Sequence, residues 1–164
     1  MYPPYGAMYI AAAAGKAGLE ARIINVDTDR ISNEEVIGRL KALEPGYIGI
    51  SGIVAPSYKY IKGLSSDIRS AMPESVQILG GGLSSAAETV LRNMPVDYVV
   101  AGEGDTAITE LIGRLREGKT PSDVTGIYCR EGERCVFTGT RKLIADIDTL
   151  PYPAFDLVDM SRYM

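Results

Sequence analysis

The chain has 164 residues, of which 46% are hydrophobic and 23% are charged, and its formal net charge at pH 7 is −4. This length is sufficient for one domain with a buried core. Basic residues occur at most two in a row, so nucleic acid is not expected as a partner. No apolar run approaches the roughly 18 residues of a membrane-spanning helix, and the first residues lack the basic region of a signal peptide. We therefore expect a cytoplasmic protein without a membrane partner.

The chain contains no histidine and two cysteines, Cys129 and Cys135. Without histidine it can form neither a Ser-His or Cys-His nucleophile pair nor an imidazole-ligated metal site. Two cysteines are also too few to hold a zinc ion or an iron–sulfur cluster. A two-residue turn at 131–132 would place Tyr128 opposite Cys135 and the two thiols on different faces of a β-hairpin. We therefore interpret both cysteines as ordinary strand residues rather than a disulfide or metal pair.

The first third of the chain alternates helix and strand signals. An alanine-rich segment, Tyr5–Lys16, predicts an apolar helix that ends at Gly18. The apolar run 21–26 predicts a strand, followed by a polar loop at 27–30. Ser32 and Glu35 have the spacing of a capping box, which predicts a helix over 34–43.

The same alternation continues to residue 117. The expected elements are a strand at 47–51, a loop at 52–57, a helix to about 72, a strand at 76–79, a short helix at 86–93, a strand at 96–101 and a helix at 106–117. Ser84 or Ser85 is expected to cap the short helix, and Asp105 or Thr106 is expected to cap the last one.

The composition changes after Gly118. The segments 125–130 and 133–138 predict a β-hairpin that lies outside the main sheet or on its edge. Pro151 and Pro153 predict that the tail is extended.

This order of elements predicts an α/β fold with three layers, flavodoxin-like or Rossmann-like, around a mostly parallel sheet. The expected division is a domain over 1–120, followed by a hairpin and linker over 121–164. Doubly wound domains usually begin with a strand, whereas this chain begins just before a predicted helix. We therefore expect that the first strand of the pattern is missing and that both ends are cuts, or the start is unusual, in a larger protein.

Two predicted strands run into glycine turns that open a helix, at residues 80–82 and 102–104, and a third strand ends at Ser51. Such turns bring a helix N-terminus to the carboxyl edge of an open α/β sheet, where these folds bind ligands. The sequence therefore predicts a ligand site at this edge.

Five segments, in this order, carry a resemblance to a known family. They are Pro3-Pro4-Tyr5-Gly6 before the alanine-rich helix, Ile48-Gly49-Ile50-Ser51, Leu79-Gly80-Gly81-Gly82, the stretch DYVVAGEGD from Asp97 to Asp105, and the stretch LPYPAFDL from Leu150 to Leu157. On these segments the chain resembles the N-terminal cobalamin-binding domain of B12-dependent radical SAM proteins, a group that includes methyltransferases and an anaerobic magnesium-protoporphyrin ester cyclase. The resemblance covers nearly the whole chain.

The resemblance implies a cobalamin cofactor and a set of residues that would hold it. These are Ser51, Gly52, Ile53, Gly80, Gly81, Gly82, Leu83, Gly102, Glu103 and Gly104. Residues 80–82 would let the nucleotide tail pass close to the sheet, or would form a turn that needs a positive φ. Ser51 would bind the benzimidazole or its sugar, or would satisfy strand-end backbone groups. Residues 102–104 would line the nucleotide pocket, or Glu103 would only favour the helix dipole. A bulky residue at Gly81 is expected to obstruct the tail and to leave the core intact.

Members of this family generally continue into a barrel whose Cys-x-x-x-Cys-x-x-Cys motif binds a 4Fe–4S cluster, and no such motif occurs in this chain. The resemblance therefore implies that the cluster and S-adenosylmethionine belong to a downstream radical SAM domain in cis, and that this chain is not catalytic alone. The group often lacks a histidine below the cobalt, in agreement with a histidine-free chain. No catalytic and no metal-ligating residues are assigned.

Two other functions stay open. A flavodoxin-like interaction or signalling domain would have this fold without a cofactor, and a nucleotide- or flavin-binding domain would use the same edge. A phospho-receiver domain needs an acceptor aspartate and a lysine at strand ends, where this chain has Ser51, Gly80 and Ala101. Asp27 and Asp29 follow a predicted strand, but a solvated loop is favoured there over an acidic metal site. The substrate and the oligomeric state are not predicted.

Overall fold

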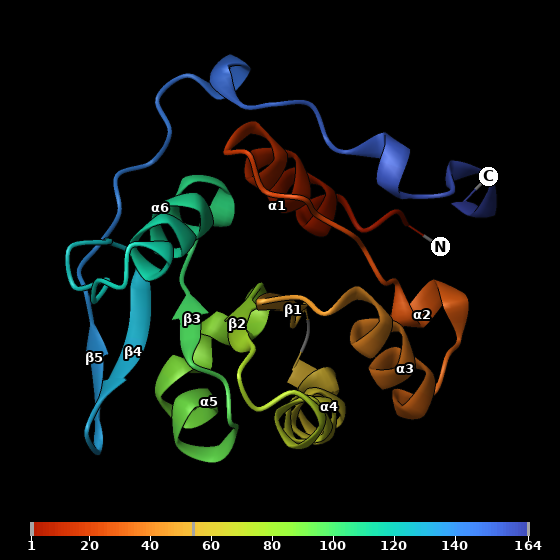
Figure 1. Ribbon diagram of the computed structural model, residues 1–164. Helices are drawn as coiled ribbons and strands as arrows, with labels where there is room; N and C mark the ends of the chain where they lie inside the picture. Colours follow the sequence, from red (N-terminus) through yellow and green to blue (C-terminus); the bar gives the residue numbers. More distant parts are fainter. Residues whose placement is uncertain (1, 54, 164) are drawn as a thin grey trace.

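A five-stranded sheet lies between two layers of helices in the computed structural model, which describes residues 2–53 and 55–163 (Figure 1). The strands, in their order across the sheet, are β1 (Tyr47–Ser51), β2 (Val76–Gly80), β3 (Tyr98–Val100), β4 (Ile127–Glu131) and β5 (Arg134–Phe137). The first three strands are parallel, and the β4–β5 hairpin extends the sheet in antiparallel fashion. This arrangement confirms the predicted three-layer α/β fold.

The helices divide between the two faces of the sheet. They are α1 (Tyr5–Lys16), α2 (Val26–Asp29), α3 (Asn33–Leu43), α4 (Tyr58–Ala71), α5 (Ala87–Asn93) and α6 (Gly104–Arg116). Figure 1 shows α1 and α6 on one face, and α4 and α5 on the other with α3 beside α4. We refer to these as the α1/α6 face and the α4/α5 face. In the described part of the chain, no helix is both long enough and apolar enough to cross a membrane.

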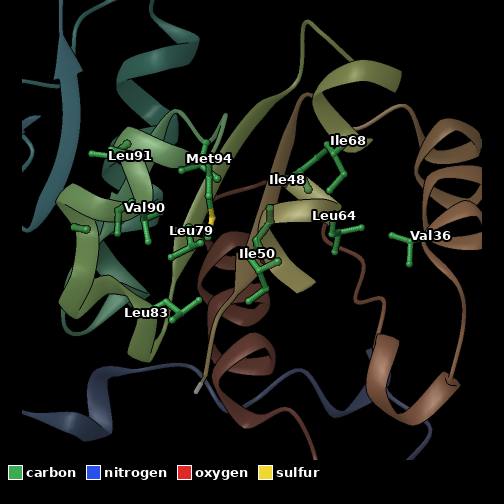
Figure 2. Close-up of a cluster of buried hydrophobic side chains, with 14 of the residues drawn as sticks. Val36, Ile48, Ile50, Leu64, Ile68, Leu79, Leu83, Val90, Leu91 and Met94 are labelled. Carbon is green, nitrogen blue, oxygen red and sulfur yellow. The ribbon is translucent and has the colours of Figure 1, made fainter. Parts of the chain in front are cut away.

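Two apolar clusters hold the layers together. Strand side chains alternate between the two faces, so Ile48, Ile50 and Leu79 pack against the α4/α5 layer, as Figure 2 shows. The second cluster joins Ile78 and Val100 to the inner side of α6. The sheet is therefore buried on both faces, which explains why β2 and β3 read as nearly continuous apolar runs.

The predicted strand at 21–26 is wrong. Residues 21–25 form no strand with any described residue, and Val26 already begins helix α2. The Asn25 side chain accepts a hydrogen bond from the Thr28 backbone, which caps this helix at the position predicted to be a loop. Ile24 and Val26 still pack against the core. Their apolar character thus reflects burial and not strand pairing, which sequence periodicity does not distinguish.

The helix starts were predicted with mixed success. The capping box of Ser32 and Glu35 is present at the start of α3. Neither Ser84 nor Ser85 caps α5, because the 3-10 turn Gly82–Ala86 precedes it and the Ser85 hydroxyl donates to the Gly82 carbonyl instead. Helix α6 begins at Gly104, before both of its predicted caps.

The hairpin lies at the edge of the main sheet, as predicted, but its turn is one residue later than expected. Arg130 faces Cys135, and Cys129 faces Val136, so the turn residues are Gly132 and Glu133. Gly132 has φ +60°, which suits the first central position of a tight hairpin turn. The two thiols still lie on opposite faces of the hairpin, as the sequence predicted.

The tail, residues 139–163, crosses the outer side of α1 (Figure 1). The Ala154 backbone donates to the Met8 carbonyl at 3.1 Å, and Arg162 pairs with Asp29 beyond α1. Residues 151–154 form no regular element, in agreement with the predicted extended segment, whereas Phe155–Leu157 forms a 3-10 turn that the sequence did not predict.

Arg130 connects the hairpin to the C-terminal end of α5. Its guanidinium donates to the carbonyl oxygens of Leu91, Met94 (2.6 Å) and Val96 (2.7 Å). These carbonyls lie at and just beyond the end of a helix, where they lack intrahelical partners. One planar guanidinium thus satisfies three backbone acceptors, an arrangement that lysine does not reproduce.

Replacing Arg130 with methionine is expected to lower the free energy of unfolding by about 1–2 kcal/mol, because the carbonyls lose a charged donor. Urea denaturation measures this change. Arg134→Met is the matched control, since Arg134 is exposed on the neighbouring strand and a change within about 0.5 kcal/mol is expected there. Equal midpoints for the two variants would contradict the assigned role of Arg130.

Candidate functional site

The carboxyl ends of the three parallel strands meet at one edge of the sheet. Ser51 at the end of β1 lies in register with Gly80 at the end of β2, and β3 ends at Val100 beside them. Each strand is followed by a turn and then a helix, so the loops after β1, β2 and β3 and the N-terminus of α6 share this edge. The predicted site residues are therefore brought to one edge, as expected for this topology.

The loops after β1 and β2 cross each other in close contact. The Gly52 backbone donates to the Gly80 carbonyl at 2.9 Å, and Leu83 donates to the Gly52 carbonyl at 2.9 Å. A Cβ atom on Gly82 would lie 2.3 Å from the Ile53 carbonyl oxygen, and one on Gly81 would lie 2.9 Å from the Gly52 carbonyl oxygen. The packing of the two loops thus by itself requires Gly81 and Gly82.

Gly81 also has φ +80°, a conformation that side chains other than glycine adopt with strain. The expectation that a bulky residue at Gly81 leaves the core intact is therefore wrong. Such a residue would push against backbone atoms of the crossing loop before it met any ligand.

Gly80 differs from its two neighbours. A Cβ atom on Gly80 would meet no described atom within 4 Å, and the same holds for Gly49 in β1 and Gly102 after β3. Gly49 and Ser51 alternate with the core residues Ile48 and Ile50, so both face the α1/α6 side, where they are exposed.

Gly80 shares this face because it is in register with Ser51. We call Gly49, Ser51 and Gly80 the glycine shelf. It is a stretch of the α1/α6 face at the carboxyl edge with open space above it, and small residues there let a ligand approach the backbone closely. In the described structure, the Ser51 hydroxyl makes no hydrogen bond. It therefore does not satisfy backbone groups at the end of the strand, which was the alternative role considered for it.

The remaining predicted residues have different surroundings. Ile53 is 71% exposed next to the crossing loops, whereas Leu83 is buried in the cluster on the α4/α5 face. The structure therefore does not bring Leu83 to the shelf. Gly104 lets α1 pack closely on α6, because a Cβ there would lie 2.8 Å from the Ile10 side chain.

The turn before α6 is open to solvent. Gly102 has φ +68°, and Glu103 is exposed at the N-cap position of α6, where its side chain makes no capping bond in the described structure. The free N–H groups of the first helical turn can therefore donate to a ligand, and the helix dipole favours an anionic or polar group there.

Two residues of this edge were missed by the sequence reasoning. Gly49 was assigned only to a strand, although its alternation with Ile48 and Ile50 was a usable signal. Asp105 was assigned as a helix cap, yet it is buried in the first turn of α6 with 8% of its surface exposed.

Asp97, part of the resemblance to the family, lies at the opposite edge of the sheet. Its carboxylate accepts hydrogen bonds from Arg69 at 2.6 Å and from the Gln77 backbone at 2.7 Å. This aspartate therefore connects the start of β3 to β2 and to the helix before it, which is a structural role.

Asp29, considered for an acidic metal site, pairs instead with two arginines. Burial acts to raise its pKa, but hydrogen bonds from Arg39 and Arg162 outweigh burial and bring the pKa below its usual value. Among the described residues, no group of three or more cysteine, aspartate or glutamate side chains is arranged to hold a metal ion.

Curated proteins of similar sequence are larger than this chain. An uncharacterized methyltransferase of Pyrococcus horikoshii is 26% identical, over 98% of this chain and 35% of that protein. An anaerobic magnesium-protoporphyrin IX monomethyl ester cyclase of Cereibacter sphaeroides is 25% identical, over 99% of this chain and 27% of that protein. The chain therefore spans only about a third of the length of these relatives or less.

Solved structures share the fold. The radical S-adenosylmethionine methyltransferase TsrM from Kitasatospora setae, with cobalamin and a [4Fe-4S] cluster bound, matches with a TM-score of 0.78 at 17% identity, over 85% of this chain and 28% of that chain. The cobalamin-dependent radical enzyme OxsB, with aqua-cobalamin and S-adenosylmethionine bound, matches with a TM-score of 0.83 at 17% identity, over 94% of this chain and 22% of that chain.

A family model described as the B12 binding domain matches residues 1–112, which is more than half of the chain. The matched range includes the three parallel strands, the crossing loops and the start of α6. The chain therefore belongs to the B12 binding domain family.

Proposed function

We propose that this chain binds cobalamin at the carboxyl edge of its sheet and is the cofactor-binding module of a larger B12-dependent radical SAM enzyme of the methyltransferase or cyclase kind. Membership of the B12 binding domain family supports the cofactor. The small share of each relative that the chain spans supports the larger enzyme. On this proposal the 4Fe–4S cluster and S-adenosylmethionine are held by another domain, residues 121–164 lead toward it, and this chain alone does not catalyse a reaction.

The glycine shelf is the observation that carries the placement of the cofactor. A corrinoid needs a slot for its nucleotide tail and polar groups for its amides and phosphate. We place this tail in the open space above Gly80, where a side chain would occupy the same position. The Ser51 hydroxyl lies beside it and is available as a hydrogen-bond partner for the base or sugar of the tail.

The other proposed binding residues contribute backbone or shape. Gly52, Gly81 and Gly82 hold the crossing loops in place, and Ile53 offers an exposed apolar side chain to the ring. Gly102, Glu103 and Gly104 form the turn that presents the N–H groups of α6. Leu83 acts only from within the core. Bound cobalamin would supply the cobalt chemistry, and these residues would bind and orient it.

Mixing the chain with hydroxocobalamin tests the proposal. We expect that the visible spectrum of the cofactor stays with the protein after desalting, at close to one equivalent. Flavin mononucleotide and ATP, each mixed with the chain in a separate experiment, are expected to be lost from the protein on desalting. Retention of the flavin or the nucleotide without cobalamin would favour the alternative ligands, and retention of none of the three would favour an interaction domain.

Electron paramagnetic resonance of the bound Co(II) form is expected to show no nitrogen superhyperfine splitting from below the cobalt. The chain has no histidine that could supply a protein imidazole, and the shelf would hold the cofactor's own benzimidazole away from the metal. Free Co(II) cobalamin with its base attached is the reference spectrum. Splitting equal to that reference would show that the base remains on cobalt, and would contradict the placement of the tail above the shelf.

A further inference from the structure

Among the buried polar side chains of the described residues, Asp105 differs from the others because it has no hydrogen-bond partner. Ser65 and Gln77 bond to each other, and Ser75 donates to the Pro45 carbonyl. Asp105 is only 8% exposed, yet its carboxylate makes no hydrogen bond or ion pair with any described residue. A carboxylate that is enclosed and that no described protein group binds leaves its acceptor oxygen atoms available to water or to a ligand.

The carboxylate is nevertheless reachable from outside. Every side-chain nitrogen or oxygen that is fully buried in the described structure has a hydrogen-bond partner. Since Asp105 has none, its oxygen atoms must keep contact with the surface through a small opening. The residue is therefore enclosed, but a ligand can reach its acceptor atoms.

The position of Asp105 directs it toward the glycine shelf. It lies three and seven residues before Ile108 and Ile112, on the side of α6 that packs into the cluster with Ile78 and Val100. Side chains of a helix tilt toward its N-terminus, and α6 begins at the carboxyl edge, four residues after the end of β3. Asp105 therefore lies in the first turn of α6, on the sheet-facing side of the helix, at the carboxyl edge and over the same face of the sheet as Gly80 and Ser51.

The chemistry of the group restricts what it can bind. An ionised carboxylate only accepts hydrogen bonds and repels phosphate oxygens. The N-terminus of α6 makes a negative charge tolerable in the first turn. A hydroxyl or an amide N–H enclosed beside the shelf is therefore the matching partner, and in a corrinoid with its tail above Gly80 such donors belong to the nucleotide tail.

We propose that Asp105 determines the specificity of this site for corrinoids that carry a nucleotide tail, because its carboxylate accepts a hydrogen bond from a hydroxyl or amide donor of that tail. This inference rests on the proposed cobalamin function and adds a selective residue to it. In the chain without ligand the carboxylate oxygens are open to water, and a donor of the tail replaces that water when the tail enters.

Titrations of the full chain with hydroxocobalamin and with diaquocobinamide, which lacks the nucleotide, test the role of Asp105. The Asp105→Ala variant is expected to bind hydroxocobalamin roughly ten- to a hundredfold more weakly and cobinamide within about threefold of the parent, since one charged hydrogen bond is lost. Asp105→Asn keeps an acceptor oxygen, and its affinity for hydroxocobalamin is expected to lie between the affinities of the parent and of Asp105→Ala. The melting temperature of both variants without ligand is expected to stay close to that of the parent, because the Asp105 side chain makes no hydrogen bond or ion pair with a described residue that the substitution would remove.

Glu74→Gln is the matched control, since Glu74 is exposed in the turn before β2 at the opposite edge and carries the same charge. Unchanged hydroxocobalamin affinity in Asp105→Ala would overturn the inference and leave the proposed function standing. Equal losses for both corrinoids would assign the donor to the ring and overturn the role of the tail. A lower melting temperature together with weaker binding would make Asp105 a structural residue. If the parent chain binds no cobalamin, the proposed function itself fails and this inference with it.

Discussion

Replacing Gly80 with valine is expected to weaken cobalamin binding by at least about tenfold, while the stability of the chain stays within about 1 kcal/mol of the parent. A Cβ atom at Gly80 meets no described atom within 4 Å, and its φ is not positive, so valine fits the strand end. The added side chain occupies the space above the glycine shelf that the nucleotide tail would use. Titration with hydroxocobalamin measures the affinity, and urea denaturation measures the stability.

Gly46→Val is the matched control for Gly80→Val. Gly46 precedes β1 at the opposite edge of the sheet and also has open space around its α-carbon. The control is expected to bind cobalamin as the parent does. If Gly80→Val also bound cobalamin with the parent's affinity, the tail would not lie above the shelf, and the site would have to be placed elsewhere on the edge.

Replacing Gly82 with alanine is expected to lower the free energy of unfolding by about 2–3 kcal/mol, the largest stability change we expect for a single methyl group. The new Cβ would lie 2.3 Å from the carbonyl oxygen of Ile53, which is a backbone atom and cannot turn aside. The crossing loops would have to separate, and the hydrogen bond from the Leu83 backbone to the Gly52 carbonyl would be lost. Urea denaturation gives the change directly.

Gly80→Ala is the control for Gly82→Ala, because it adds the same methyl group two residues earlier into open space. Its free energy of unfolding is expected to equal or slightly exceed that of the parent, since alanine restricts the unfolded chain. Similar unfolding midpoints for the two alanine variants would contradict the close crossing of the loops. Together the two positions separate a glycine that the fold needs from one that leaves room for a ligand.

Local signals in the sequence predicted most of the fold. The capping box at Ser32 and Glu35, the positive φ of Gly18 and the alternation of Ile48 and Ile50 each depend on neighbours within a few residues, and each is present in the structure. The order of helices and strands then limited the topology to an open α/β sheet, and the strand carboxyl ends of such a sheet form the edge at which we place the ligand.

The sequence by itself determined the fold class and the family, and it indicated the edge at which we place the ligand, because these follow from short-range patterns and from motif order. Only the tertiary structure decided which glycines serve the fold and which leave open space, since that depends on what packs against each one, as Gly82 and Gly80 show. It also decided that residues 21–25 pair with no described strand and that Arg130 caps α5 from a distant hairpin. The burial of Asp105 was also decided by the tertiary structure. An aspartate near the start of a helix has the same sequence pattern whether it caps the helix or is enclosed, and only the packing of α6 against the sheet distinguishes the two.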